Sequence, residues 1–388
     1  MVKTGPFVAD ILSSIPNESV PESVETRTAK PSSSSGAVIS SGGRNGGDRI
    51  FFGGLHLISW ATIALFVGML VFIGALAWDS VRELGLKFWI GTDWNPPLEA
   101  FGAAPFIVGT LASSAIAVLI STPISVGTAL FLREIAPKKL SGIVAFLVEL
   151  LAAIPSVVYG LWGVFVLAPV MRDTIHPFLA KFLGPDTYFS AALGHGLTAL
   201  VYPFLLIGDA FGLTQVTLVS LSEKMMAFSQ GLFDGAPLGL GLLTSGLVLS
   251  IMITPTVTAL SREVLLTVPD SVREAALGLG ATRWEMIRLA LMKTARAGLV
   301  GAIILGLGRA IGETMAVTMV IGNRNEIPKS LFEPAQTMAS VIANEYNEAD
   351  GLHLSSLAFV GLSLFAVSLI VNLFARWLIR YLKRGSRA

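Results

Sequence analysis

The chain has 388 residues, of which 53% are hydrophobic and only 14% are charged. An average soluble domain carries about 25% charged residues, so this composition excludes a soluble enzyme and a disordered scaffold and predicts a polytopic membrane protein. The net charge of +1 gives no sign of bulk nucleic-acid binding, and the lack of cysteine excludes disulfides, thiolate chemistry and cysteine-ligated metals.

The N-terminal fifty residues differ from the rest of the chain. They contain a serine-rich run at 31–36 and a glycine-rich run at 42–47. Such a stretch cannot bury enough apolar area to offset its chain entropy, so we predict a disordered tail over 1–50 and a membrane domain over 51–388. The sequence at 75–77 resembles a signal-cleavage site, but the apolar run before it is about 20 residues, longer than a signal's apolar core, which favours a retained helix.

Six apolar stretches are long enough to cross a bilayer core of about 30 Å as helices. Because backbone groups in lipid must hydrogen-bond internally, we predict an all-α polytopic membrane protein with six transmembrane helices. The stretches are 55–78, 104–132, 141–170, 236–261, 297–321 and 355–379. Kinks or breaks in three of these helices are predicted at Pro123, Pro155, Pro169 and Pro255.

Basic residues set the predicted topology. They cluster at 133–139, at 262–296 and at 376–387, whereas the other loops are acidic or balanced. With six spans, all three clusters fall on one side, as the positive-inside rule expects, and both termini are cytoplasmic. A seventh crossing at 191–208 would separate the clusters, so we predict that this ambiguous segment is re-entrant or surface-lying on the outside.

The loop between the predicted fourth and fifth spans carries two helix-start signals. Ser271 with Glu274, and Thr282 with Glu285, both fit the S/T-x-x-E capping box. Gly280 between them suits the left-handed position that ends a helix. We therefore predict two short helices that meet at Gly280.

One side of the first short helix is predicted to carry small and apolar residues. Val272, Ala275, Ala276 and Leu279 lie along it at helical spacing, and the alanines would let a partner approach closely. The residues alone leave two interpretations equally open. The segment is either a surface helix–turn–helix or a docking element.

The motif Glu274-Ala275-Ala276-x-x-x-Gly280 resembles the coupling motif of ABC importer permeases. In that family the short helix docks into a cleft on the ATP-hydrolysing subunit. The resemblance therefore implies a cytoplasmic coupling loop over about 262–296. The family pattern continues with I-x-L-P, but this chain has Ala-Leu-Met-Lys at those positions. This departure affects the expected geometry with which the chain enters the fifth span, and it leaves the coupling motif itself intact.

Two opposite charges lie inside the predicted fifth span. Arg309 and Glu313 are four residues apart, which places them on one face of a continuous helix. A charge at the bilayer centre costs roughly 2.5–3.5 kcal/mol, so both must face protein or water. One interpretation is a structural pair that neutralises itself. The other is that Arg309 meets an anion in a translocation path, since its guanidinium is a fixed fork of donors, with Glu313 holding it in place.

Other polar residues in the spans are weaker candidates. Ser156 follows Pro155 and offers a hydroxyl at a helix break, although it could equally bond a freed carbonyl. Glu149 lies near the cytoplasmic end of the third stretch, which favours a snorkelling or capping carboxylate over a ligand. The four histidines have no metal-ligand spacing, so no metal site is predicted. No P-loop motif occurs, so ATP and Mg²⁺ are expected on a partner subunit and no cofactor on this chain.

Three stretches, 149–163 (ELLAAIPSVVYGLWG), 306–317 (GLGRAIGETMAV) and 340–349 (SVIANEYNEA), together resemble the PstC-type permease family of phosphate-specific ABC importers. The resemblance implies the type I importer permease fold with a cytoplasmic coupling helix, in a bacterial or archaeal plasma membrane. The segments 1–50 and about 172–235, which we predict to be an enlarged external segment, fall outside the usual pattern.

The resemblance also implies partners and site residues. The partners would be a second homologous permease, two ATP-binding subunits, an external phosphate-binding protein and the lipid bilayer. The substrate path would include Arg309, Glu313, Thr314 and Ser156, with Arg309 interacting with phosphate and Glu313 as its partner. The alternatives are a permease for another oxyanion, such as molybdate or sulfate, or the sister permease of the same transporter. From a different class, a membrane enzyme or a channel with a coincidental loop would lack the ATPase partner.

Overall fold

The computed structural model describes residues 46–185, 187, 192, 196 and 231–384. Most of the predicted tail, and nearly all of the segment 191–208, lie outside the described residues. The first helix, α1 (Gly46–Leu76), begins inside the range that we predicted as tail. The chain divides into two compact units, Met1–Leu65 and Phe66–Ala388, so the boundary falls within α1. All the elements that follow α1 in the chain belong to the second unit.

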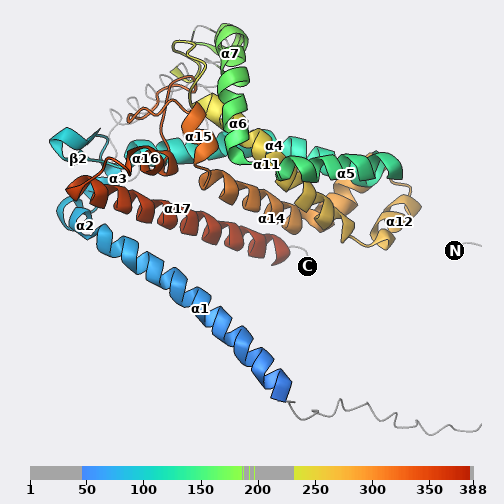
Figure 1. The fold of residues 1–388 in the computed structure, drawn as a ribbon. Helices are drawn as coiled ribbons and strands as arrows, with labels where there is room; N and C mark the ends of the chain where they lie inside the picture. The colour runs from blue at the N-terminus through green and yellow to red at the C-terminus, as the bar shows by residue number, and fades with distance from the viewer. Residues whose placement is uncertain (1–45, 186, 188–191, 193–195, 197–230, 385–388) are drawn as a thin grey trace, which may run out of the picture. The chain divides into compact units, whose positions relative to one another are not determined.

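The second unit is almost entirely helical (Figure 1). Its α-helices are α2 (Trp78–Leu84), α3 (Lys87–Ile90), α4 (Ala104–Leu130), α5 (Lys138–Ala152), α6 (Ser156–Trp162), α7 (Ala168–Val170), α8 (His176–Leu183), α11 (Leu242–Leu266), α12 (Asp270–Gly278), α13 (Arg283–Glu285), α14 (Met292–Ile311), α15 (Met315–Val320), α16 (Met338–Glu345) and α17 (Gly351–Arg384). Single π-helical segments join some of them: η2 (Phe131–Ile135), η3 (Gly163–Leu167), η4 (Met171–Ile175) and η5 (Met286–Leu291). A 3₁₀ turn, η1 (Pro96–Leu98), links two short antiparallel strands, β1 (Trp94–Asn95) and β2 (Ala100–Phe101).

Six helical segments of the described chain are long and apolar enough to cross a membrane. They are Phe51–Leu76, Ala104–Ile135, Ser156–Leu183, Leu242–Leu266, Arg283–Ile311 and Gly351–Tyr381. This confirms the prediction of an all-α protein with six membrane helices. Four of them overlap the predicted stretches along most of their length, and the third and fifth differ.

The predicted third span, 141–170, is wrong as one helix. The chain forms α5, breaks after Ala152 and resumes as α6 at Ser156. Pro155 explains the break, because proline lacks the backbone N–H and disfavours helical geometry at the residue before it. Glu149 consequently lies exposed on α5, outside the candidate span. By contrast, α4 continues through Pro123 and α11 continues through Pro255.

The predicted fifth span, 297–321, is also wrong as one helix. The helix α14 ends at Ile311, and α15 begins only at Met315. Gly312 occupies the end of α14, where its low helix propensity favours termination. The intervening residues therefore lie in a helix break.

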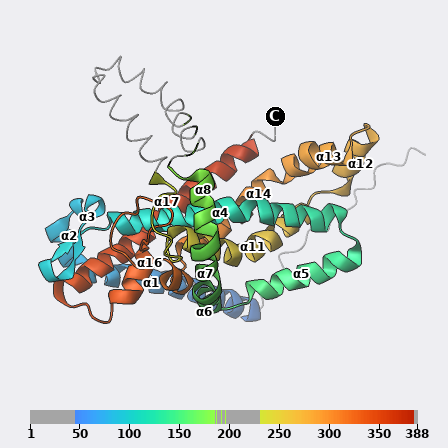
Figure 2. The same ribbon diagram turned by 90° about the horizontal axis from the view of Figure 1, so that it is seen from above.

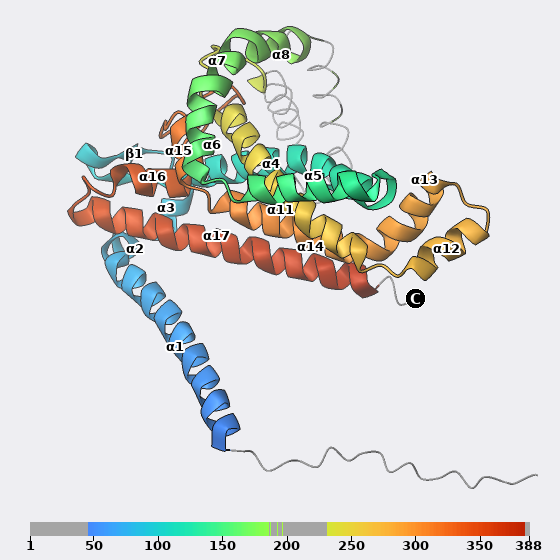
Figure 3. The ribbon, with the colours of Figure 1, turned by 45° about the vertical axis from the view of Figure 1, so that its right-hand side comes forward.

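Four long helices pack side by side: α14 contacts both α17 and α11, and α11 packs along α4. Figure 3 shows α6, α7 and α8 rising away from this layer. The interface of α4 and α11 is rich in buried small polar residues, as expected where helices approach closely in lipid. Within it, Ser125 Oγ donates to the carbonyl of Thr254 at 3.1 Å.

Three apolar clusters hold the second unit together. The central one joins α4, α6, α11 and α15 around Leu249, Met252 and Val317. Figure 2 shows α2 and α3 at one end of the unit and α12 and α13 at the other. A cluster around Phe88, Phe106 and Val360 lies at the first end, and one around Leu265, Met286 and Leu291 at the second.

Candidate functional site

Two helix breaks that are far apart in the sequence lie together in the structure. At Gly160 an added Cβ would lie 3.2 Å from Ala316 Cα, and at Gly163 it would lie 2.7 Å from a methyl of Val320. These contacts mean that α6 and α15 pack closely and run in the same direction. The breaks that precede the two helices, before Ser156 and before Met315, are therefore at the same end of this helix pair.

Close packing of α6 on α15 makes a prediction about Gly160. An added methyl would lie 2.6 Å from Met319 Sδ and 3.2 Å from the backbone of Ala316. We expect Gly160→Ala to lower the stability of the protein by about 1–3 kcal/mol, because overpacking forces backbone shifts. Thermal unfolding in detergent measures it. Gly142→Ala, in α5 with nothing within 4 Å, is the matched control and should leave stability unchanged or raise it.

Arg309 lies one turn before the break in α14 and is partly buried. Its Nη1 donates a hydrogen bond to Thr256 Oγ1 of α11 at 2.8 Å. Among the described residues, no carboxylate forms an ion pair with Arg309. The expected pairing with Glu313 on one helix face is therefore corrected, because α14 ends between the two residues.

Glu313 instead belongs to the start of α15. Its Oε1 accepts a hydrogen bond from the backbone N–H of Ala316 at 3.3 Å. A carboxylate at this position satisfies one of the free N–H groups of the first turn. The carboxylate of Glu313 thus caps the N-terminus of α15. The guanidinium of Arg309 is held by the neutral hydroxyl of Thr256.

The two candidate hydroxyl residues flank the breaks. Ser156 is the first residue of α6, and Thr314 precedes the first residue of α15. Within the part of the chain that the structure describes, neither hydroxyl has a hydrogen-bond partner, and both side chains are partly exposed. The structure thus places Arg309, Glu313, Thr314 and Ser156 around one pair of broken helices, with two hydroxyls and one guanidinium able to donate hydrogen bonds.

The loop between α11 and α14 forms the first predicted short helix, α12, but not the second as a separate helix, because α13 continues without interruption through η5 into α14. Gly280 has a φ of +85° and follows α12, and its N–H donates to the carbonyl of Leu277 at 2.9 Å. The N–H of Ala281 donates to the carbonyl of Ala276 at 3.2 Å, which completes a Schellman motif. The glycine-terminated first helix is confirmed.

Only one of the two predicted capping boxes forms. Thr282 Oγ1 accepts from the N–H of Glu285 at 3.3 Å, and Glu285 Oε2 accepts from the N–H of Thr282 at 2.9 Å. The box at Ser271 is absent, because α12 begins one residue earlier, at Asp270, after Pro269. Proline is tolerated at Pro269 because a residue at the start of a helix needs no N–H for an intrahelical hydrogen bond.

The surface of the loop is divided between a packed side and an exposed side. Val272 and Ala276 are partly buried and pack against the apolar cluster at this end of the unit. Glu274 and Ala275 are exposed. Large apolar side chains beyond them also face outward, with Leu279 89% and Trp284 66% exposed.

Two residues of functional interest, Thr256 and Glu134, were not predicted from the sequence. Thr256 holds Arg309 across 53 residues of sequence and is one hydroxyl among many in an apolar span. Glu134 is 3% exposed and lies within ion-pair distance of Arg133 and Arg273. It lies in the basic cluster at 133–139, which we used only to predict the topology. The one sequence signal for an ion pair there is a single carboxylate among basic residues.

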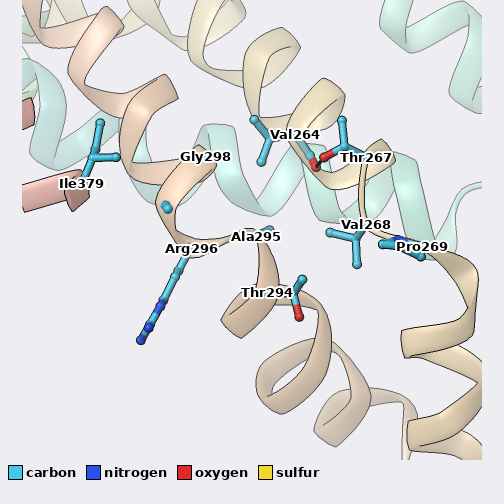
Figure 4. A pocket seen from close by; sticks show the side chains of 10 residues that line it. Val264, Thr267, Val268, Pro269, Thr294, Ala295, Arg296, Gly298 and Ile379 are labelled. Carbon is cyan, nitrogen blue, oxygen red and sulfur yellow. Dashed lines mark hydrogen bonds between the residues drawn. The ribbon is translucent and has the colours of Figure 1, made fainter. Parts of the chain in front are cut away.

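A cavity of about 520 Å³ lies at the α12 end of the unit, between α11, α14 and α17. Figure 4 shows its lining, with Val264 and Thr267 from α11, Ala295 and Gly298 from α14, and the side chain of Arg296 directed away. None of the four predicted path residues lines this cavity, so it is separate from the broken helices.

Residues 121–385 match the family described as binding-protein-dependent transport system inner membrane component. Two similar curated proteins are both named phosphate transport system permease protein PstC. The protein from Pasteurella multocida is 42% identical over 79% of this chain and 84% of its own length. The protein from Mesorhizobium japonicum is 38% identical over 86% and 90%, respectively.

Similar solved structures come from ABC transporters. A chain of a bacterial alginate ABC transporter is 16% identical and covers 87% of this chain and 98% of its own, with a TM-score of 0.47. A chain of the inward-facing MetNI methionine ABC transporter is 14% identical and covers 74% and 99%, respectively, also with a TM-score of 0.47. The family match and the extent of identity to the two PstC proteins are the decisive observations. The chain belongs to the family of binding-protein-dependent transport system inner membrane components and, within it, to the PstC permeases.

Proposed function

We propose that this chain is the permease subunit of an ATP-driven importer of inorganic phosphate and forms half of its translocation path. The identity of 38–42% to proteins named phosphate transport permeases, over most of the chain, carries the proposal. Arg309 supports it from the structure. A guanidinium without a carboxylate partner in the described chain, beside two broken helices, is suited to a transient oxyanion.

The path residues have distinct roles in this proposal. Arg309 supplies the positive charge, and Thr256 orients it by accepting one N–H. Ser156 and Thr314 offer hydroxyl groups at the breaks. Because Glu313 is engaged at the start of α15, it does not neutralise Arg309 by direct contact and leaves its remaining donors available to phosphate.

ATP hydrolysis is proposed to occur on partner subunits, with Mg²⁺ bound there and no cofactor on this chain. The coupling helix is α12, with Glu274, Ala275 and Gly280 in the roles that the family motif implies. The exposed Leu279 and Trp284 extend this surface and fit an apolar cleft on an ATPase. Ala276, on the side of α12 that packs against the apolar cluster, anchors α12 to the membrane helices.

The assembly that this function requires has further members. We propose a second homologous permease, two ATP-binding subunits and an external phosphate-binding protein, in a bacterial or archaeal plasma membrane. Both termini would be cytoplasmic, because the basic clusters at the α12 end and at the C-terminus then lie inside.

Competition between anions tests the proposed substrate. The complex, reconstituted in liposomes with its neighbouring subunits and ATP, should take up labelled phosphate, and excess sulfate or molybdate should leave the rate unchanged. Preferential inhibition by sulfate or molybdate would assign the chain to another oxyanion. Uptake that needs no ATPase subunit would favour a channel.

A further inference from the structure

A buried carboxylate joins the coupling helix to the second membrane helix. Glu134 lies in η2, the π-helical end of the span that begins with α4, and its side chain is 3% exposed. Its Oε2 is 3.4 Å from Nε of Arg273, which belongs to α12. Its Oε1 is 3.7 Å from Nε of Arg133. One carboxylate therefore compensates two guanidinium groups, one from each helix.

A second ion pair closes the connection. Arg133 Nη2 donates to Asp270 Oδ1 at 3.3 Å, and Asp270 is the first residue of α12. The two pairs attach α12 to η2 at two points about one turn apart, which holds the helix against both sliding and rotation. Of the two carboxylates, Asp270 is largely exposed and Glu134 is not, so the Glu134 contacts are much less screened by solvent.

The hydrogen bonding of Glu134 is incomplete. Oε1 of Glu134 and Nε of Arg133 are buried and have no hydrogen-bond partner in the described chain. The charges are thus compensated, but the short charge-assisted hydrogen bonds are not made. Both guanidinium groups therefore depend on the charge of Glu134, at 3.4 Å and 3.7 Å, and removing that charge would leave them uncompensated.

The contact leads toward the candidate path through packed helices. Glu134 continues from α4, α4 packs along α11, and α11 carries Thr256, which holds Arg309. The apolar cluster beside Glu134 also packs the underside of α12, through Val272 and Ala276, onto the same helix ends. An unbroken series of helix contacts therefore connects α12 with Arg309.

We propose that Glu134 is a positioning residue that makes α12 and α4 move as one body, so that displacement of α12 by an ATPase reaches the substrate path. This inference rests on the proposed coupling role of α12. It assigns no contact with substrate or nucleotide to Glu134. Its contacts with Arg133 and Arg273 instead determine how strongly ATP hydrolysis is coupled to phosphate transport.

The test compares Glu134→Gln with wild type in the reconstituted complex. Glutamine keeps the shape and removes the charge, leaving Arg133 and Arg273 uncompensated. We expect phosphate transported per ATP hydrolysed to fall about tenfold, within the range of 5–150-fold usual for coupling between sites, while the complex still assembles. Glu263→Gln, which removes an exposed carboxylate paired with Arg262 at the same end, is the matched control and should leave the ratio unchanged.

A double-mutant cycle distinguishes this role from simple stabilisation. Arg273→Gln alone should give a similar loss, and the two substitutions together should be no worse than either one, because both remove the same contact. Additive losses, or a normal ratio in Glu134→Gln, would overturn the proposal. If Glu134→Gln fails to assemble, Arg273→Gln, whose side chain is 43% exposed, carries the same test.

A distance measurement separates failure of this inference from failure of the phosphate assignment. Because the chain lacks cysteine, spin labels can be placed at two exposed positions, Ser271→Cys on α12 and Leu119→Cys on α4. In the complex with its ATPase subunits, the distance should not change when ATP binds, whereas with Glu134→Gln it should shift or broaden. A shift in the Glu134-intact protein, or none with Glu134→Gln, would contradict the proposal, whichever anion is transported.

Discussion

Phosphate uptake should fall at least about tenfold in Arg309→Gln, with assembly of the complex unchanged. Glutamine removes the positive charge, and its shorter side chain ends before the position of Arg309 Nη1, which donates to Thr256 Oγ1 at 2.8 Å. Hydrogen bonds to charged groups contribute about 1.5–3 kcal/mol, which corresponds to roughly a tenfold to hundredfold change in binding or rate. Initial rates of ATP-dependent phosphate uptake in proteoliposomes measure the effect, and size-exclusion chromatography verifies assembly.

Two further variants define what Arg309 contributes. Arg309→Lys keeps the charge but loses the planar fork, so its uptake should lie between wild type and Arg309→Gln. Arg324→Gln is the control, because Arg324 is half exposed and pairs with Glu326 at 2.6 Å away from the broken helices. Wild-type uptake in Arg309→Gln would leave Arg309 with a structural role only.

The second large effect is expected at the tip of the coupling loop. Leu279→Ser should weaken binding of the ATPase subunits by about tenfold to a hundredfold, because burying a leucine contributes about 1.5–3 kcal/mol. Leu279 is 89% exposed directly before Gly280, so serine there removes no internal contact. Titration of purified ATPase subunit against the permease pair in detergent gives the dissociation constant.

The matched control lies at the opposite end of the unit. Leu86, between α2 and α3, is 77% exposed, and Leu86→Ser should leave ATPase binding unchanged. Equal affinities for wild type and Leu279→Ser would show that docking does not use this surface. Equal losses in both variants would point to a general effect on folding.

Local signals allowed much of the fold to be predicted. Length and apolarity identify the membrane helices, and a left-handed glycine or a capping threonine acts within a few residues, so Gly280 and the Thr282–Glu285 box form as predicted. Ser271 failed as a cap because Pro269 sets the helix start first. The break predicted at Pro155 is confirmed, whereas no signal in the sequence located the break at Gly312 inside its apolar run.

The site was less predictable because its contacts are not local. Arg309 and Glu313 match a helical pair in the sequence, yet the end of α14 between them sends each to a different partner. Thr256 reaches Arg309 from another span, and Arg273 reaches Glu134 from another helix. Which of several similar residues meet across a helix bundle depends on how the helices are rotated, and the pattern within one helix does not contain that information.

Accumulation of labelled phosphate in proteoliposomes containing the complete complex, with the phosphate-binding protein outside and ATP inside, tests the central claim most directly. The account predicts that phosphate rises inside above its outside concentration only when ATP is hydrolysed, and that Arg309→Gln removes this accumulation. Phosphate that merely equilibrates across the membrane, at the same rate with and without ATP, would contradict it.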